Sequence, residues 1–202
     1  MKFQKKNNAE KNLKENKNAL QDMAGSTQDL PKTRKLLKLG IGLCLLVCFD
    51  QLTKWFAAES LKNAEPVRLW NGVFELHYLE NGGSAFGMLQ GQRVFFLLIA
   101  AAMLLVVPYL YCRIPSSRRF FLLRVIAVLF LGGAAGNAID RVLHGYVVDF
   151  FYFILIDFPI FNVADIYVTV SAALLIWSFL FYYKDEELEG VFPKKTKASD
   201  RR

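Results

Sequence analysis

Histidine and cysteine are scarce in this chain of 202 residues, which contains two histidines and three cysteines. His77 and His144 stand far apart, and no His-Glu-x-x-His pattern is present, so the sequence gives little support for a zinc site. Cys44, Cys48 and Cys112 lie within or at the edge of long apolar runs, where free thiols behave as small hydrophobic side chains. We therefore expect no metal site and no cofactor.

Charged residues are rare in four long apolar stretches, and the chain as a whole is 54% hydrophobic with 18 phenylalanines. A helix needs about 20 apolar residues to cross a bilayer, whereas a soluble domain shows alternating or amphipathic patterns. The expected spans are residues 39–57, 94–111, 120–139 and 163–183. The sequence therefore predicts an α-helical membrane protein with four transmembrane helices.

The two ends of the chain lack such apolar runs. Residues 1–36 and 184–202 are polar and charged, a composition typical of disordered tails, which leaves residues 37–183 as the membrane domain. The N-terminal polar segment is too long for a secretory leader, and no small-x-small cleavage site follows the first span. We therefore expect the first span to remain in the mature protein.

Basic residues are distributed unevenly around the predicted spans. Most of those close to a span precede the first, follow the fourth or connect the second to the third; they include Lys35, Lys38, Arg113, Arg118, Arg119 and Lys184. The positive-inside rule then predicts cytoplasmic N and C termini. These flanks also account for the net charge of +7, and they are not interleaved with stacking aromatic residues, so we expect no nucleic-acid partner.

The connection between the first two spans, residues 58–93, is expected to form a small β cradle on the extracytoplasmic side. Residues 67–70 and 73–79 flank Asn71-Gly72, which is typical of a β-hairpin with a primed two-residue turn. The other extracytoplasmic connection includes residues 150–161, which are apolar but too few to span. We expect that segment to lie in the membrane interface or to dip shallowly into it.

Two aspartates lie at the mouths of predicted spans: Asp149 in Gly145-Tyr-Val-Val-Asp149-Phe150 and Asp165 in Phe161-Asn-Val-Ala-Asp165. A carboxylate is costly at an apolar boundary and therefore indicates function by default. Two neighbouring carboxylates share a proton, so the ionised one can take a proton from water while the protonated one donates to a peptide group. The pattern therefore favours aspartyl acid/base chemistry.

Packing accounts for several other polar residues taken one at a time. The spacing of Asn137, Asp140 and Arg141 places them on one helix face, and Asp140 can form a helix-end ion pair with Arg141. Asp50 and Lys54 have the spacing of a buried i, i+4 ion pair.

The start of the fourth span also has a packing explanation, because Asn162 can cap a helix whose first turn contains Asp165. None of these local explanations accounts for the gathering of four Asp or Asn side chains and an arginine at one membrane depth.

The ordered motifs resemble those of the lipoprotein signal peptidase family, also called signal peptidase II. The resemblance covers about residues 37–183. It rests on Asp50-Gln-x-Thr-Lys54, Asn81-x-Gly83-Ser84-Ala85-Phe86, Gly132-Gly-Ala-x-Gly136-Asn137-x-x-Asp140-Arg141 with Gly145-x-Val-Val-Asp149-Phe150, and Phe161-Asn162-x-Ala-Asp165.

The resemblance implies a membrane-embedded aspartic endopeptidase in which Asp149 and Asp165 are the catalytic pair. Residues implied to bind substrate or to support the site are Asp50, Lys54, Asn81, Gly83, Asn137, Asp140, Arg141 and Asn162, and Asp140 is not itself catalytic. The implied substrate is a prolipoprotein whose lipobox cysteine carries diacylglycerol, cleaved just before that cysteine. The implied setting is the bacterial cytoplasmic (inner) membrane, with membrane lipids around a monomer and the site at the outer face.

Two other functions remain open at this point. One is a proton-coupled membrane carrier with Asp50, Asp140 and Asp149 as relay groups, although carriers have more spans, midplane carboxylates and repeats that this sequence lacks. The other is a scaffold in which the polar residues only hold helices together. A presenilin-type protease is disfavoured because no Gly-x-Gly-Asp signature is present.

Overall fold

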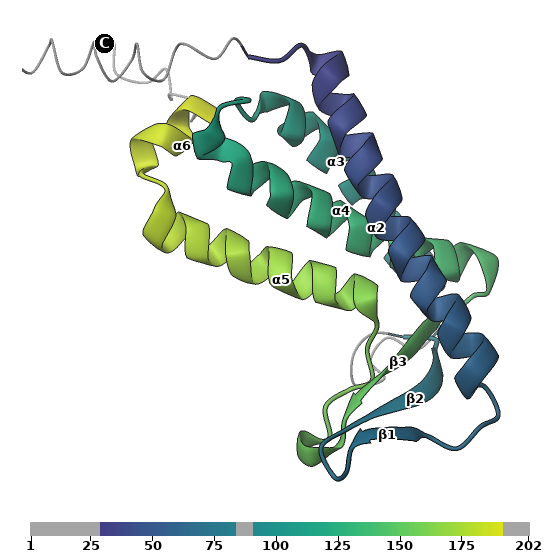
Figure 1. Cartoon of the computed structure of the whole chain (residues 1–202). Helices are drawn as coiled ribbons and strands as arrows, with labels where there is room; N and C mark the ends of the chain where they lie inside the picture. The colour runs from purple at the N-terminus through teal and green to yellow at the C-terminus, as the bar shows by residue number, and fades with distance from the viewer. Residues whose placement is uncertain (1–28, 84–90, 192–202) are drawn as a thin grey trace, which may run out of the picture.

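The computed structural model describes residues 29–83 and 91–191, which form a helical bundle with a small sheet at one end (Figure 1). Four described helical segments are long and apolar enough to cross a membrane, as the sequence predicts: Lys32–Leu61, Arg93–Arg113, Arg118–Leu143 and Val163–Tyr182. Their α-helical parts are α2 (Lys32–Leu61), α3 (Arg93–Arg113), α4 (Phe121–Leu143) and α5 (Val163–Trp177).

The helical structure extends into both segments expected to be disordered tails. Helix α2 begins at Lys32, so residues 32–36 are helical. A short helix, α6 (Asp185–Val191), follows α5, and Val191 is buried against Ile114 and Tyr183. Residues 1–28 and 192–202 of the expected tails lie outside the described residues.

Small residues of α4 allow its neighbours to approach closely. A methyl group at Gly132 would collide with Leu46 of α2, and one at Gly133 would collide with the carbonyl of Ala164 in α5. Close backbone approach of this kind is how small residues stabilise helix pairs in lipid. Helix α4 therefore lies at the centre of the bundle, and its side chains contact both α2 and α5.

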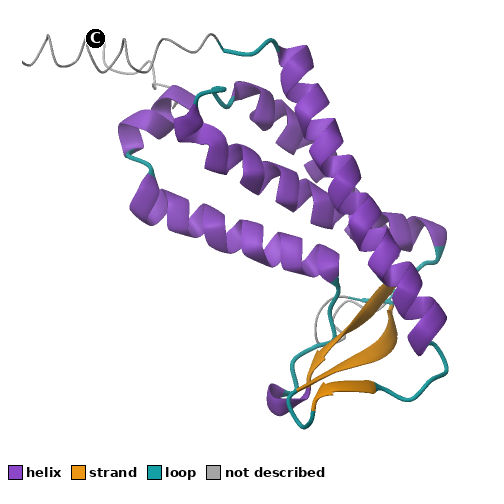
Figure 2. Ribbon diagram, viewed as in Figure 1, coloured by secondary structure: helices purple, strands orange, loops and turns teal. Residues whose placement is uncertain are grey.

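The sheet is antiparallel with the order β1 (Val67–Trp70), β2 (Phe74–Asn81) and β3 (Val147–Phe153), as Figure 2 shows. The predicted hairpin is confirmed, but its turn is not of the primed type. Gly72 has a φ of +72°, whereas the positive-φ residues of the described chain do not include Asn71. The pairing of the two strands also has a register shift between Arg68 and Trp70.

Strand β3 was not predicted from the sequence. Residues 150–161 were expected only to lie at the interface, yet residues up to Phe153 pair with β2, and Phe161 returns to bridge Phe151. Val148 and Phe150 are buried against Ala57, Leu61 and Val163 at the end of the bundle. A short run that is apolar except for Asp149 gives no regular alternation from which a strand can be recognised, and its partner β2 is far away in the sequence.

Candidate active site

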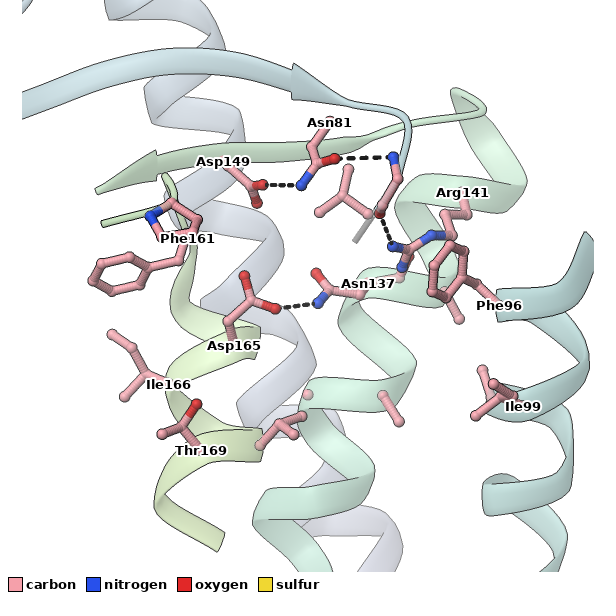
Figure 3. Close-up of a pocket in the computed structure, with 18 of the residues that line it drawn as sticks. Asn81, Phe96, Ile99, Asn137, Arg141, Asp149, Phe161, Asp165, Ile166 and Thr169 are labelled. Atoms are coloured by element: carbon pink, nitrogen blue, oxygen red, sulfur yellow. Dashed lines mark hydrogen bonds between the residues drawn. The ribbon is translucent and has the colours of Figure 1, made fainter. Parts of the chain in front are cut away.

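The two aspartates singled out from the sequence, Asp149 and Asp165, line the same cavity (Figure 3). Asp149 comes from the middle of β3 and is 2% exposed, and Asp165 comes from the first turn of α5. The cavity has a volume of about 620 Å³ and lies between the sheet and helices α3, α4 and α5. Its other polar lining residues are Asn81, Asn137, Arg141 and Thr169.

Asn162 is the N-cap of α5, as the sequence predicts, and it also links the two aspartates. Its side-chain oxygen accepts a hydrogen bond from the Asp165 amide at 3.1 Å, and its own amide donates to Oδ2 of Asp165 at 3.1 Å. This reciprocal capping box fixes the first turn of the helix. The Asn162 side-chain nitrogen donates to Oδ1 of Asp149 at 2.6 Å. One buried asparagine therefore sets the position of both carboxylates.

Two further asparagines donate to the remaining carboxylate oxygens. The Nδ2 of Asn81 donates to Oδ2 of Asp149 at 2.8 Å, and the Nδ2 of Asn137 donates to Oδ1 of Asp165 at 2.7 Å. Each of the four carboxylate oxygens thus accepts one hydrogen bond from a neutral donor. Among the described residues, no salt bridge reaches either carboxylate.

Burial and charge repulsion both act on Asp149. Burial raises the pKa of this carboxyl to about 7, and the negative charge of Asp165 contributes to the increase. The hydrogen bonds from Asn81 and Asn162 act in the opposite direction without cancelling it. Near neutral pH Asp149 can therefore hold a proton, which acid/base chemistry by two carboxylates requires of one member of the pair.

Behind the cavity wall, Lys54 forms salt bridges with Asp50 at 3.0 Å and with Asp140 at 2.9 Å, and all three are almost fully buried. The i, i+4 pair of Asp50 and Lys54 that the spacing predicts is therefore present. The predicted pair of Asp140 with Arg141 is not formed. Asp140 instead contacts Lys54, Gln51 and the backbone of Val148, because its side chain points toward α2 and β3.

Arg141 faces the cavity instead. Its guanidinium donates to the carbonyl of Gly83 at 3.0 Å and lies 4.4 Å from the ring centre of Phe96. The amide of Gly83 donates to Oδ1 of Asn81 at 2.9 Å, so the Nδ2 of that asparagine faces Asp149. The remainder of that motif, Ser84 to Phe86, lies outside the described residues.

Sequence reasoning missed two contributors. Gln51 donates to Oδ1 of Asp140 at 2.9 Å and to the carbonyl of Gly136 at 3.2 Å. Its place inside the Asp50-Gln-x-Thr-Lys54 motif was a signal that could have identified it. Phe96, which stacks under Arg141, belongs to an ordinary apolar span and carries no such signal.

The chain is similar over most of its length to known membrane enzymes. A model of the family described as Signal peptidase (SPase) II matches residues 43–181. A lipoprotein signal peptidase from Symbiobacterium thermophilum is 47% identical over 131 residues, which are 64% of this chain and 85% of that protein. One from Bacillus subtilis is 38% identical over 133 residues, which are 65% and 85% of the two chains.

The fold has a solved counterpart as well. A structure described as a bacterial membrane enzyme at 2.3 Å resolution has a TM-score of 0.64 and 30% identity, and the match covers 79% of this chain and 93% of that one. A second, at 1.9 Å resolution, has a TM-score of 0.63 and 32% identity and covers 72% and 94%. The matched family segment includes both cavity aspartates and all three asparagines that contact them. This multi-pass bacterial membrane protein therefore belongs to the signal peptidase II family of aspartic peptidases.

Proposed function

We propose that Asp149 and Asp165 are the catalytic pair with which this chain removes signal peptides from prolipoproteins. The observation that carries the proposal is the convergence of two carboxylates, held by the neutral amides of three asparagines, on one largely apolar cavity. No observation in the described part of the chain favours a proton-coupled carrier, because the buried acids gather at the sheet end of the bundle.

In the proposed reaction the shared proton rests on Asp149. Burial favours the neutral form of that carboxyl, whereas Asp165 lies in the first turn of α5, where the helix dipole favours negative charge. Ionised Asp165 removes a proton from water, and the water oxygen adds to the scissile carbonyl carbon. Protonated Asp149 donates its proton to the carbonyl oxygen, which gives a tetrahedral diol.

Collapse of that intermediate completes the hydrolysis. Asp165, now protonated, donates to the leaving nitrogen as the C–N bond breaks, and Asp149 recovers its proton from the diol hydroxyl as the carbonyl forms again. Atoms and charges balance without a covalent enzyme intermediate. A positioned acid or base is worth about 10²–10⁴-fold in rate, so loss of either aspartate is expected to lower the rate by at least that factor.

The apolar part of the cavity supports a lipid-modified substrate. Below the two aspartates it is lined by Ile99, Met103, Phe130, Ala134, Val168 and Val170. Such a surface suits an apolar signal-peptide segment and the acyl chains of a diacylglyceryl cysteine, with the bond before that cysteine at the aspartates. The basic flanks support cytoplasmic termini, which puts the aspartates at the outer face of the cytoplasmic membrane. We expect the monomer to be sufficient, because one chain supplies both aspartates and the three asparagines that hold them.

The proposal is tested by a gel-shift assay with purified wild type, Asp149→Asn and Asp165→Asn. Each receives a diacylglyceryl-modified prolipoprotein or the same precursor without lipid. We expect cleavage of the lipidated precursor by the wild type and none by either variant. Asp157→Asn is the matched control, because the Asp157 carboxylate accepts from the exposed Tyr152 hydroxyl, an oxygen that asparagine retains, and its left-handed backbone suits asparagine. Normal cleavage by a folded Asp149→Asn or Asp165→Asn protein would refute the assignment.

A further inference from the structure

We infer that Lys54 is a positioning residue that joins two clamps, one behind each proposed catalytic aspartate. Asp50 and Asp140 each hold the backbone amide of the residue directly before one member of the pair, and Lys54 bridges these two carboxylates. This inference rests on the proposed function of Asp149 and Asp165, and it assigns the buried cluster a role in setting their relative position.

The first clamp connects α2 to α5. Asp50 is fully buried, and its Oδ1 accepts a hydrogen bond from the amide of Ala164 at 2.9 Å. This amide belongs to the first turn of α5, whose amides have no partner within the helix. Asp165 is the next residue, so the carboxylate of Asp50 fixes the backbone from which the Asp165 side chain projects.

The second clamp connects α4 to β3. Asp140 is 1% exposed, and its Oδ2 accepts a hydrogen bond from the amide of Val148 at 3.1 Å. Asp149 is the next residue along the strand. The same relation is thus repeated on two unrelated elements: a buried carboxylate that does not line the cavity holds the amide just before a carboxylate that does.

Lys54 connects the clamps to each other and to the pair itself. Its ammonium has three donors, and they reach Oδ2 of Asp50 at 3.0 Å, Oδ2 of Asp140 at 2.9 Å and Oδ1 of Asn137 at 2.9 Å. Because the Asn137 oxygen faces the ammonium, its Nδ2 faces Asp165. Lys54 therefore orients one of the amides that hold the pair while it keeps the two clamping carboxylates together.

Stability alone is a poor explanation for this cluster. Burying two carboxylates and one ammonium costs more than apolar packing of the same volume in many proteins. The surrounding helix is also adapted to it, since a methyl group at Gly136 would collide with the Asp50 carboxylate. The cluster takes the place of apolar packing, and its hydrogen bonds with Ala164, Val148 and Asn137 connect it to the surroundings of Asp149 and Asp165.

The cluster also contributes charge close to the pair. The charged and titratable groups that face this region from the packed elements are Asp50, Lys54, Asp140, Arg141, Asp149, Asp165 and Tyr167. Replacing Asp140 by asparagine preserves an oxygen for the Val148 amide but removes one negative charge. The surroundings of Asp149 become more positive, so its deprotonation becomes easier.

The test uses Lys54→Met, Asp140→Asn and the double variant, each assayed for thermal stability in detergent and for kcat, KM and pH profile on the lipidated precursor. Lys54→Met leaves two buried carboxylates without a counter-ion and should lower the melting temperature. Adding Asp140→Asn restores the net charge of the cluster and should recover the melting temperature. It should not recover kcat, which stays about 10²-fold low with little change in KM, because the Asn137 oxygen has lost the charged donor of Lys54 and keeps only the neutral donor of Asn162 at 3.1 Å.

Asp140→Asn alone should fold and should lose activity at a lower pH than the wild type on the alkaline side of the profile. Lys62→Met is the matched control, since Lys62 is an exposed lysine at the end of the same helix that pairs with Glu80. It should leave kcat and the pH profile unchanged. Recovery of both stability and kcat in the double variant, or an unmoved alkaline limb in Asp140→Asn, overturns the inference. In both of these outcomes the wild type still cleaves the lipidated precursor. Failure of this inference can therefore be distinguished from failure of the proposed function.

Discussion

Two lysines of α2 are buried at opposite ends of the bundle, and their surroundings differ completely. Lys35 is 2% exposed and donates to the carbonyls of Cys112 and Ile114 at 3.1 and 2.7 Å, and among the described residues its carboxylate partner is the exposed Asp29. Lys54 is 3% exposed, and its partners are the side chains of Asp50, Asp140 and Asn137.

The difference indicates that Lys35 stabilises the fold, whereas Lys54 supports the proposed active site. Lys35 satisfies carbonyls at the end of α3 that have no partner within their helix, and its charge is balanced by a carboxylate open to solvent. Lys54 lies between two carboxylates that accept hydrogen bonds from the backbone next to the cavity aspartates. We therefore expect changes near Lys54 to alter catalysis and changes near Lys35 to alter stability alone.

Apart from the two aspartates themselves, the largest expected effect at the Lys54 end is that of Asn162→Ala. This change removes the N-cap of α5 and the donor to Asp149 together, so we expect kcat to fall at least about 10²-fold. Cleavage of the lipidated precursor measures it, with Asn71→Ala in the hairpin turn as a control of unchanged activity. An Asn162→Ala enzyme with wild-type kcat would contradict the proposed geometry.

The pH profile of the wild type is the next test of the site around Lys54. Because burial raises the pKa of Asp149 to about 7, the proton that the pair shares is lost above that value. We expect kcat to fall about tenfold per pH unit on the alkaline side. A profile that stays flat from pH 6 to pH 9, measured with protein that remains folded, is the contrary result; a control scan of stability over the same range identifies any unfolding.

Asp149 should also weaken the fold at alkaline pH. Its folded-state pKa of about 7 lies above the ordinary value of 3.8, so its stabilising effect is fully present below pH 3.8 and is lost as the pH rises through about 7. At pH 8 we expect Asp149→Asn to be more stable than the wild type, by on the order of 3 kcal/mol. The advantage should vanish near pH 4. Thermal unfolding at the two pH values measures it, and equal stability at pH 8 rules out a strongly buried charge.

The Lys35→Met variant tests the same comparison at the other end of α2. It leaves the carbonyls of Cys112 and Ile114 without their donor, so we expect a loss of about 1–3 kcal/mol in unfolding free energy. The kcat and pH profile of the folded protein should match those of the wild type. A shifted pH profile in this variant would remove the distinction between the two lysines.

The smallest effect is expected for Glu187→Gln at the same end. Glu187 forms a salt bridge with Arg119 at 2.8 Å, and both side chains are substantially exposed. Such pairs contribute about 0–1 kcal/mol, so stability should decrease only slightly and cleavage should not change. A melting curve in detergent at low and high salt measures the contribution, which should decline as salt is added.

Particular residues show which features of the structure could be predicted from the sequence. The spans, the hairpin and the N-cap at Asn162 were predictable because hydropathy, turn residues and capping motifs act over a few neighbouring positions. The convergence of Asp149 and Asp165 was suggested by their two short motifs at the mouths of the spans, and the resemblance of the ordered motifs to a known family implied that they are a catalytic pair. Strand β3 escaped prediction because its partner strand is far away in the sequence.

The sequence by itself therefore determined a four-span membrane protein and the two motifs that carry Asp149 and Asp165. Only the tertiary structure decided which partners the buried charges take. It paired Asp140 with Lys54 rather than with the adjacent Arg141, and it directed the ammonium of Lys54 toward Asn137. The physical reason is that the cost of a buried charge depends on every group within hydrogen-bonding distance. Those groups come from helices and strands that meet only when the chain has folded.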